Sequence, residues 1–152
     1  MFKKMGSSPY NKTEKLAFVS ANVFSFILVF YSIFLPLKLG STWFYVGIVI
    51  YLFGLTMFMT AIVNIATTPL DEPFVKGLYR YSRHPMTFFS FFTFIGAGIA
   101  TASWIFLLFS IMVIILFAIY IIAEERGCCE RYGDTYRNYI NKTPRWIGIP
   151  TD

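Results

Sequence analysis

An uncharged run of 39 residues, from Pro85 to Ala123, constrains the fold of this chain more than any other feature. As one helix, at ~1.5 Å per residue, it would be roughly 58 Å long, whereas the hydrocarbon core of a bilayer is about 30 Å thick. The run is therefore predicted to cross a bilayer twice, as a helical hairpin whose ends return to the same face. Arg83-His84 before the run and Glu124-Glu125 after it would then lie close together.

The composition agrees with a membrane protein. Of the 152 residues, 57% are hydrophobic and only 14% are charged, whereas soluble domains carry about 25% charged residues. No stretch is left for a separate soluble domain, so residues 1–152 are predicted to form one all-α membrane domain. Long apolar runs predict four transmembrane helices, the last two forming the hairpin, at about residues 16–35, 43–66, 85–100 and 104–123.

Residues 124–152 are predicted to form a cytoplasmic tail with its own helix. Apolar and aromatic residues recur there at helical spacing on one face: Cys129, Tyr132, Tyr136, Tyr139 and Ile140. Charged residues occupy the other face, which is typical of an amphipathic helix on a membrane surface. Gly127 and Gly133 are the expected weak points of this helix, since glycine is a poor helix former.

The distribution of basic residues predicts the orientation in the membrane. With both termini in the cytoplasm, the inside segments hold 12 of the 13 Lys and Arg residues, and only Lys38 lies outside. This matches the excess of positive charge in cytoplasmic loops. Topology thus explains the net charge of +5, and no nucleic-acid partner is predicted. No metal site is predicted either, because adjacent Cys128 and Cys129 with one distant His make a poor zinc-ligand set.

The two ends of the uncharged run carry opposite charges. His84 and Pro85 stand at the predicted start of a helix, where free N–H groups suit an anion, and Arg83 adds a positive charge. Glu124 and Glu125 stand near the predicted end of the next helix, where carboxylates oppose the helix dipole. Taken alone, the carboxylates are explained as a solvated stop signal and the arginine as a lipid-headgroup contact. Together they predict a site for a zwitterion with a carboxylate and an ammonium, such as an amino-acid headgroup.

Three motifs between residues 71 and 150 resemble those of the isoprenylcysteine carboxyl methyltransferase family and of related small membrane phospholipid methyltransferases. They are Gly77-Leu78-Tyr79-Arg80-Tyr81-Ser82-Arg83-His84-Pro85, then Glu124-Glu125-Arg126, then a tail segment that contains Glu130, Tyr136, Tyr139 and Arg145. The resemblance implies S-adenosylmethionine as methyl donor, bound without a Rossmann domain. It also implies that the cofactor-binding residues are Arg83, His84, Pro85 and Tyr136, with Glu124 or Glu125 holding the cofactor's ammonium group.

The resemblance further implies a membrane lipid or lipidated molecule as the methyl acceptor, and it leaves the acceptor's chemistry open. A carboxylate, as on a prenylcysteine-like group, is ionised at neutral pH and needs only a cation such as Arg145. A lipid amine must lose a proton, which requires a base such as Glu125. Arg145 and Glu125 are therefore the candidate catalytic residues, and the oligomeric state is left open.

Two other functions remain open on the sequence. One is an NADPH-dependent membrane reductase of sterol-like double bonds, a family with a C-terminal pattern like Tyr132-Gly133 followed by Tyr136 and Tyr139. The other is a non-enzymatic membrane scaffold with the same fold, suggested by Thr87 and Phe89 at positions where relatives usually have Tyr and Gly. The bulky Phe89 is also expected to narrow a lipid entrance beside residues 87–89.

Overall fold

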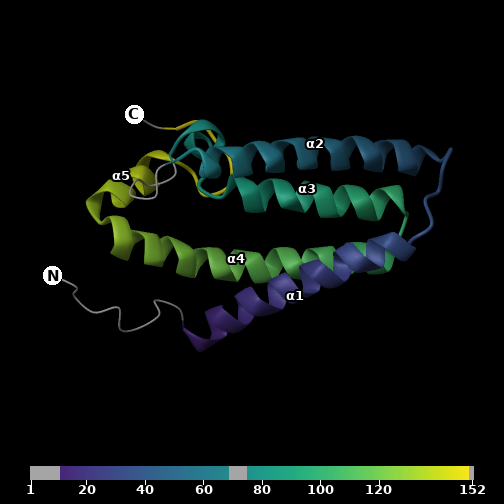
Figure 1. The fold of residues 1–152 in the computed structure, drawn as a ribbon, viewed down its shortest axis with the longest axis horizontal. Helices are drawn as coiled ribbons and strands as arrows, with labels where there is room; N and C mark the ends of the chain where they lie inside the picture. Colours follow the sequence, from purple (N-terminus) through teal and green to yellow (C-terminus); the bar gives the residue numbers. More distant parts are fainter. Residues whose placement is uncertain (1–10, 69–74, 151–152) are drawn as a thin grey trace.

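The structure, a computed structural model, describes residues 11–68 and 75–150. The predicted N-terminal tail up to Tyr10, the acidic residues Asp71 and Glu72, and residues 151–152 lie outside the described residues. Within the described ranges every regular element is a helix. The elements are α1 (Lys12–Phe34), α2 (Thr42–Ala66), one turn of 3₁₀ helix η1 (Gly77–Arg80), α3 (Pro85–Ala100), α4 (Trp104–Tyr132) and α5 (Asp134–Lys142) (Figure 1).

Three of the four predicted spans are long and apolar enough to cross a membrane. They are α1, α2 and α4, with 23, 25 and 29 residues, in agreement with an integral membrane protein. α3 is apolar but has only 16 residues, which is about 24 Å of helix against ~30 Å of hydrocarbon. A full crossing by α3 therefore stays a prediction, as does the cytoplasmic location of both termini.

α3 and α4 are antiparallel, as the hairpin predicted, and α3 also lies along α2 (Figure 1). Glycines let the α2 and α3 backbones approach. A Cβ added at Gly47 would lie 2.2 Å from the Ala100 nitrogen, and one added at Gly96 would lie 2.4 Å from the Tyr51 nitrogen. Small residues of this kind are typical of helix contacts inside membranes. The contact brings the start of α3 beside the end of α2, at the polar end of the molecule.

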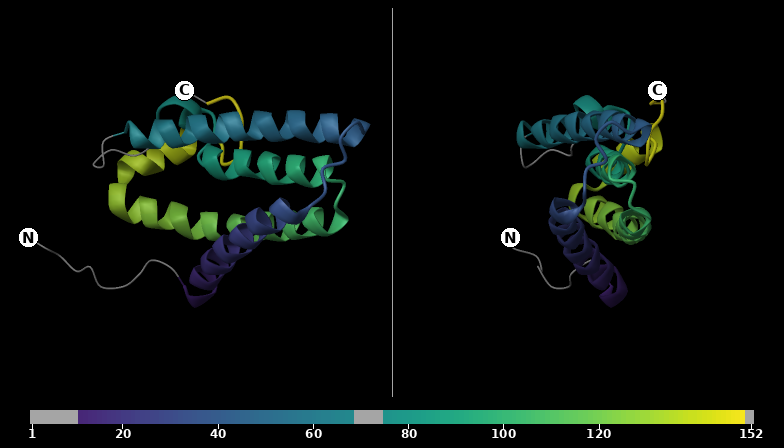
Figure 2. Two further views of the ribbon diagram at one scale, coloured as in Figure 1. Left: turned by 45° about the vertical axis from the view of Figure 1, so that its right-hand side comes forward. Right: turned by 90° about the vertical axis from the view of Figure 1, so that its right-hand side faces the viewer.

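α1 packs against α4 in antiparallel orientation and crosses it at an angle (Figure 2). Arg126 Nη2 on α4 lies 2.6 Å from Glu14 Oε2 near the start of α1. One turn further along α1, the ring centroids of Phe18 and Tyr120 are 4.4 Å apart. Deeper in the bundle, the two helices share a buried core made of Leu28, Phe106 and Val113. The start of α1 is thereby held beside the polar end of α4.

α4 ends at Tyr132 rather than at Ala123, where the sequence predicted the end of the fourth span. Hydropathy set that predicted end, whereas Glu and Arg are good helix formers and continue the helix. The chain turns at Gly133, where φ is 58°, a conformation that favours glycine, and Gly127 stays helical. The predicted amphipathic tail helix is thus confined to the nine residues of α5, which buries Tyr136.

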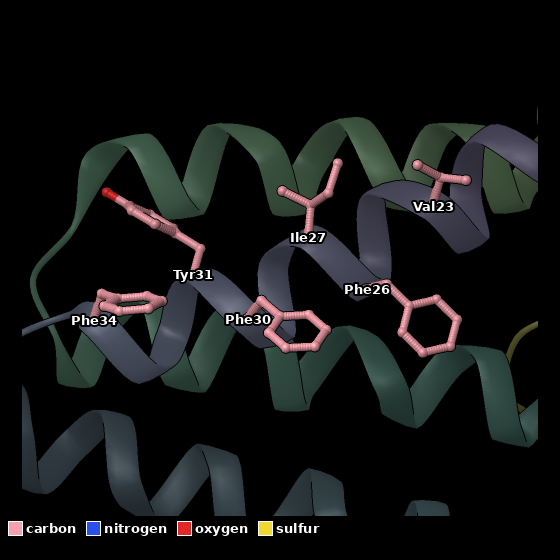
Figure 3. Close-up of a pocket in the computed structure, with 6 residues that line it drawn as sticks. All are labelled: Val23, Phe26, Ile27, Phe30, Tyr31 and Phe34. Carbon is pink, nitrogen blue, oxygen red and sulfur yellow. The ribbon is translucent and has the colours of Figure 1, made fainter.

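An apolar hollow of about 500 Å³ lies on α1 (Figure 3). Its lining residues all come from that helix: Val23, Phe26, Ile27, Phe30, Tyr31 and Phe34. The Tyr31 hydroxyl is the one polar side-chain group among them, so the hollow has the character of a lipid-facing surface. The candidate site therefore lies elsewhere, at the polar end of the helices.

Candidate functional site

A pocket of about 390 Å³ lies at the polar end, between α1, α3, α4 and α5. Small-molecule sites typically have volumes of ~300–1,000 Å³. The charged groups in its lining are Arg83, His84 and Glu124. Most of the other lining residues are aromatic, namely Phe18, Phe117, Tyr79, Tyr120, Tyr132, Tyr136 and Tyr139. The pocket therefore combines a few charges with an aromatic wall, as cofactor sites commonly do.

Glu125 is the centre of a buried ion-pair cluster behind this pocket. Its side chain is 8% exposed, and its Oε1 lies 2.8 Å from Arg83 Nη1 and 3.3 Å from His84 Nε2. Its Oε2 accepts a 2.7 Å hydrogen bond from Arg145 Nη2. Glu125 is not among the described residues that line the pocket. It ties the loop before α3 to the tail after α5.

Glu124, by contrast, faces the pocket. Adjacent residues on a helix are ~100° apart, so the two carboxylates point in different directions. The Glu124 side chain is 39% exposed, and its Oε2 lies 3.4 Å from His84 Nδ1. The pair is thus divided: one carboxylate is buried among cations, and the other is accessible to a ligand.

His84 lies between the two carboxylates and is buried. Its backbone N–H donates a 3.2 Å hydrogen bond to Ser82 Oγ, and α3 begins at the next residue, Pro85, whose missing N–H is tolerated at a first helical position. Burial disfavours the protonated imidazole, but hydrogen bonds to Glu124 and Glu125 outweigh burial. The pKa of His84 is therefore raised above its ordinary value.

Replacing His84 with Gln is expected to change how stability depends on pH. Because the folded pKa is raised, His84 stabilises the fold fully below its unfolded pKa of about 6.5, and this contribution is lost as pH rises through the folded pKa. The parent should lose stability over that range, whereas the variant should lack this loss. Thermal unfolding in detergent between about pH 5 and pH 9 measures the effect. Parallel pH profiles for the two proteins would contradict it.

The tail after α5 is fastened to the loop before α3. The Arg83 N–H donates a 3.1 Å hydrogen bond to the Pro144 carbonyl, and the Gly148 N–H donates a 3.0 Å hydrogen bond to the Tyr81 carbonyl. Together with the ion pair between Arg145 and Glu125, these bonds fix the tail over the loop that carries Arg83 and His84.

α5 closes the pocket with two buried tyrosines, Tyr136 and Tyr139. The Tyr139 hydroxyl donates a 2.5 Å hydrogen bond to the Tyr79 carbonyl, which holds α5 against η1. Burial raises the pKa of Tyr136, so its hydroxyl stays protonated at neutral pH. α5 thus contributes neutral aromatic groups to the pocket.

The predicted site residues fall into two groups. Arg83, His84, Glu124 and Tyr136 line the pocket. Pro85, Glu125 and Arg145 are not among the described lining residues. Pro85 and Glu125 are adjacent in sequence to residues that are, and Arg145 contacts Glu125. Their predicted roles in binding and catalysis stay predictions.

Phe89 is not among the described residues that line the pocket, and its predicted narrowing of a lipid entrance stays a prediction. It is 3% exposed, and its ring centroid lies 6.0 Å from that of Phe53 on α2. Thr87 does line the pocket. Residues two apart on a helix are ~200° apart, so Thr87 and Phe89 occupy nearly opposite faces of α3.

Sequence reasoning missed the contribution of α1, whose Phe18 and Asn22 line the pocket. Asn22 offered a usable signal, since a side-chain amide inside an apolar span is expensive and often marks a site. Its Nδ2 donates a 2.8 Å hydrogen bond to the Phe18 carbonyl of its own helix, which offsets part of that expense.

The family model for phospholipid methyltransferases matches residues 43–135, more than half of the chain. No curated protein and no solved structure matches the chain significantly. The matched range covers all of α2 but its first residue, and the whole of η1, α3 and α4, so it includes the loop with Arg83 and His84 and both Glu124 and Glu125. Methyltransferases of this family generally use S-adenosylmethionine. The chain therefore belongs to the phospholipid methyltransferase family of membrane methyltransferases.

Proposed function

We propose that this chain transfers a methyl group from S-adenosylmethionine to a lipid-borne acceptor at the cytoplasmic membrane interface. One observation carries the proposal: Glu124 and the pair Arg83 and His84 converge on one aromatic pocket, within the segment that matches the family. When bound, S-adenosylmethionine supplies an electrophilic methyl group, which a lone pair of the acceptor attacks while the sulfur keeps the electrons of the broken bond.

The charges of the pocket fit the amino-acid end of this cofactor. Glu124 is the accessible carboxylate, suited to an ammonium group. For the cofactor's carboxylate, Arg83 offers a guanidinium whose buried Nε has no hydrogen-bond partner among the described residues. The start of α3 adds backbone N–H groups at Met86 and Thr87, both of which line the pocket. The buried, unpaired Nε supports a ligand here, since buried polar groups usually have partners.

The aromatic wall fits the remainder of the cofactor. A cation within ~6 Å of a tyrosine ring is stabilised by the ring's negative face, and a sulfonium is such a cation. Five tyrosines line the pocket: Tyr79, Tyr120, Tyr132, Tyr136 and Tyr139. Tyrosine rings are neutral, so they stabilise a sulfonium without placing a counter-ion beside it. The methyl group therefore stays open to attack by the acceptor.

We assign Glu125 and Arg145 positioning roles rather than contact with the reacting atoms. Arg145 binds Glu125 through Nη2 at 2.7 Å and Nε at 3.2 Å, so both of its hydrogen-bonded nitrogens are engaged away from the pocket. Together they hold Arg83, His84 and the tail in place. This leaves Glu124 and His84 as the titratable pair next to the pocket. The acceptor, a lipid amine or a lipid carboxylate, would enter from the bilayer along the apolar lining near Phe18 and Met86.

Cofactor binding distinguishes the proposed methyltransferase from the two alternatives, the NADPH-dependent reductase and the non-enzymatic scaffold. Cys128 lines the pocket, whereas the adjacent Cys129 is not among its described lining residues. In a Cys129→Ser background, S-adenosylmethionine is expected to slow alkylation of Cys128 by a maleimide at least fivefold, because the bound cofactor covers the thiol. NADPH should not slow it. Mass spectrometry of the purified protein in detergent measures the rate.

The matched control is the Cys128→Ser protein, in which alkylation of Cys129 should not respond to S-adenosylmethionine. Protection of Cys128 by NADPH instead would support the reductase. Protection by neither compound would support the non-enzymatic scaffold and overturn the proposed function.

A further inference from the structure

α1 contributes Phe18 and Asn22 to the candidate cofactor pocket. The ring centroids of Phe18 and Tyr120, on the antiparallel α4, are 4.4 Å apart, and Asn22 lies one turn further along α1. Asn22 is therefore about level with Phe117 of α4, which also lines the pocket. Phe117 precedes Glu124 by seven residues, which is ~10 Å along the helix. Asn22 thus lies about two turns deeper among the apolar parts of the helices than Glu124.

The pocket therefore has a charged end and an apolar end. Arg83, His84 and Glu124 form the charged end, which suits the amino-acid part of the cofactor. At the level of Asn22 the lining residues are aromatic, namely Phe18, Phe117 and Tyr120. A few polar groups in a mostly apolar pocket typically determine which ligand binds and how it is oriented. The family match begins at residue 43, so it does not include Asn22 or the rest of α1.

Asn22 has hydrogen-bonding groups that its own helix does not use. Its Nδ2 donates a 2.8 Å hydrogen bond to the Phe18 carbonyl, and this is its one hydrogen bond within residues 11–68 and 75–150. A side-chain amide has two N–H donors and an acceptor oxygen, so one N–H and Oδ1 remain. Ser25 of the same helix differs, because its hydroxyl donates its single hydrogen to the Ala21 carbonyl at 2.7 Å. Unused polar groups are costly among apolar residues, which favours a ligand at Asn22.

The remaining N–H and Oδ1 of Asn22 match a hydroxyl group. A hydroxyl can donate a hydrogen bond to Oδ1 and accept one from the N–H. An ammonium group only donates, whereas an ester or an ether only accepts. A secondary amide does both, but its N–H and C=O point in opposite directions in the trans form, so it cannot meet both groups of one side chain. The chemistry of Asn22 is therefore most complementary to a lipid hydroxyl.

We infer that Asn22 is a specificity-determining residue that binds a hydroxyl group at the head of the acceptor lipid's apolar chain. The inference rests on the proposed function for the identity of the occupant, because the cofactor would fill the charged end and leave the apolar end to the acceptor. A lipid without this hydroxyl leaves Oδ1 and the N–H without a partner, so it binds more weakly. In this role Asn22 selects the acceptor and does not touch the transferred methyl group.

The test compares two ligands with the same chain, oleyl alcohol and oleyl methyl ether, by native mass spectrometry of the full-length protein in detergent. The parent is expected to bind the alcohol about fivefold more tightly, which lies within the range for one hydrogen bond. Asn22→Leu has a side chain of similar size and suits an apolar helix, so it should fold and bind the two ligands with nearly equal affinity. Equal binding by the parent, or an unchanged preference in Asn22→Leu, would overturn the inference.

Ser25→Ala is the matched control, because it removes a polar group from the same helix and Ser25 is not among the described residues of the pocket. It should keep the preference of the parent for the alcohol. If Ser25→Ala abolishes the preference as well, a distortion of α1 explains the effect and Asn22 is no recognition group.

Protection of Cys128 by S-adenosylmethionine in the parent separates this test from that of the proposed function. Absent protection with an intact preference for the alcohol overturns the methyltransferase assignment and leaves a hydroxyl-binding site at Asn22. Intact protection with no preference for the alcohol overturns the role of Asn22 and leaves the methyltransferase assignment in place.

Discussion

The Glu125→Gln variant is expected to lose about 3–5 kcal/mol of folding free energy, the range for breaking a buried ion pair by removing one partner. The Glu125 side chain is 8% exposed and contacts Arg83, His84 and Arg145. Without its charge, Arg83 stays buried with no counter-ion, and the tail loses its ion pair to α4. Thermal or denaturant unfolding in detergent measures the loss.

Arg145→Gln is the control for this prediction. The Arg145 side chain is 40% exposed, so water can compensate for much of the lost contact, and the expected loss is at most about 1 kcal/mol. Equal stability of Glu125→Gln and the parent would mean that the cluster does not hold the tail and the loop together. A loss in Arg145→Gln as large as in Glu125→Gln would place the stabilising interaction in the tail rather than in the buried cluster.

The Glu124→Gln variant is expected to bind S-adenosylmethionine about 1.5–3 kcal/mol more weakly, the range for a hydrogen bond to a charged group. This corresponds to roughly 10- to 150-fold in Kd. Glu124 faces the pocket, and the one ion-pair partner it has among residues 11–68 and 75–150 is His84, at 3.4 Å. The fold should therefore survive the change, and titration calorimetry on the purified protein can follow binding directly.

Glu130→Gln is the matched control, since Glu130 is an exposed carboxylate further along α4 and is not among the described residues of the pocket. Its affinity for the cofactor should equal that of the parent. If Glu124→Gln also binds as tightly as the parent, the ammonium group is held elsewhere and the cofactor assignment to this pocket is wrong. The two glutamate variants together separate the expected effect of Glu125 on stability from the expected effect of Glu124 on cofactor binding.

The division between the two glutamates gives a physical reason for placing carboxylates at this end of α4. The sequence suggested that both carboxylates oppose the dipole at the end of the helix, but α4 continues to Tyr132, so they lie inside it and that cost does not apply. Contacts of Glu125 with two arginines and a histidine offset the cost of burying its charge. Glu124 has no comparable set of partners among the described residues. A partly exposed carboxylate that lines a pocket is suited to binding a ligand rather than to stabilising the fold.

Much of the architecture followed from the length of one apolar run. A 39-residue segment without charge cannot be a single crossing, and this alone brought His84 near Glu124 and Glu125. The resemblance to membrane methyltransferases, read from short motifs, is confirmed by the family match. These inferences can be made from the sequence because bilayer thickness limits the length of a membrane-spanning helix, and charged residues mark where the helix leaves the bilayer.

The orientation of individual side chains depended on packing between helices, which the pattern of apolar and charged residues along the sequence does not specify. Rotation by one residue on α4 determines that Glu124 faces the pocket and Glu125 the buried cations. Close backbone contact with α2 turns Phe89 away from the pocket, and antiparallel contact with α4 brings Asn22 of α1 into it. Hydropathy predicted the end of the fourth span at Ala123 but not the end of the helix, which continues to Tyr132 because Glu and Arg are good helix formers. Which side of a helix meets which neighbour follows from contacts between segments distant in the chain, and only the folded arrangement supplies them.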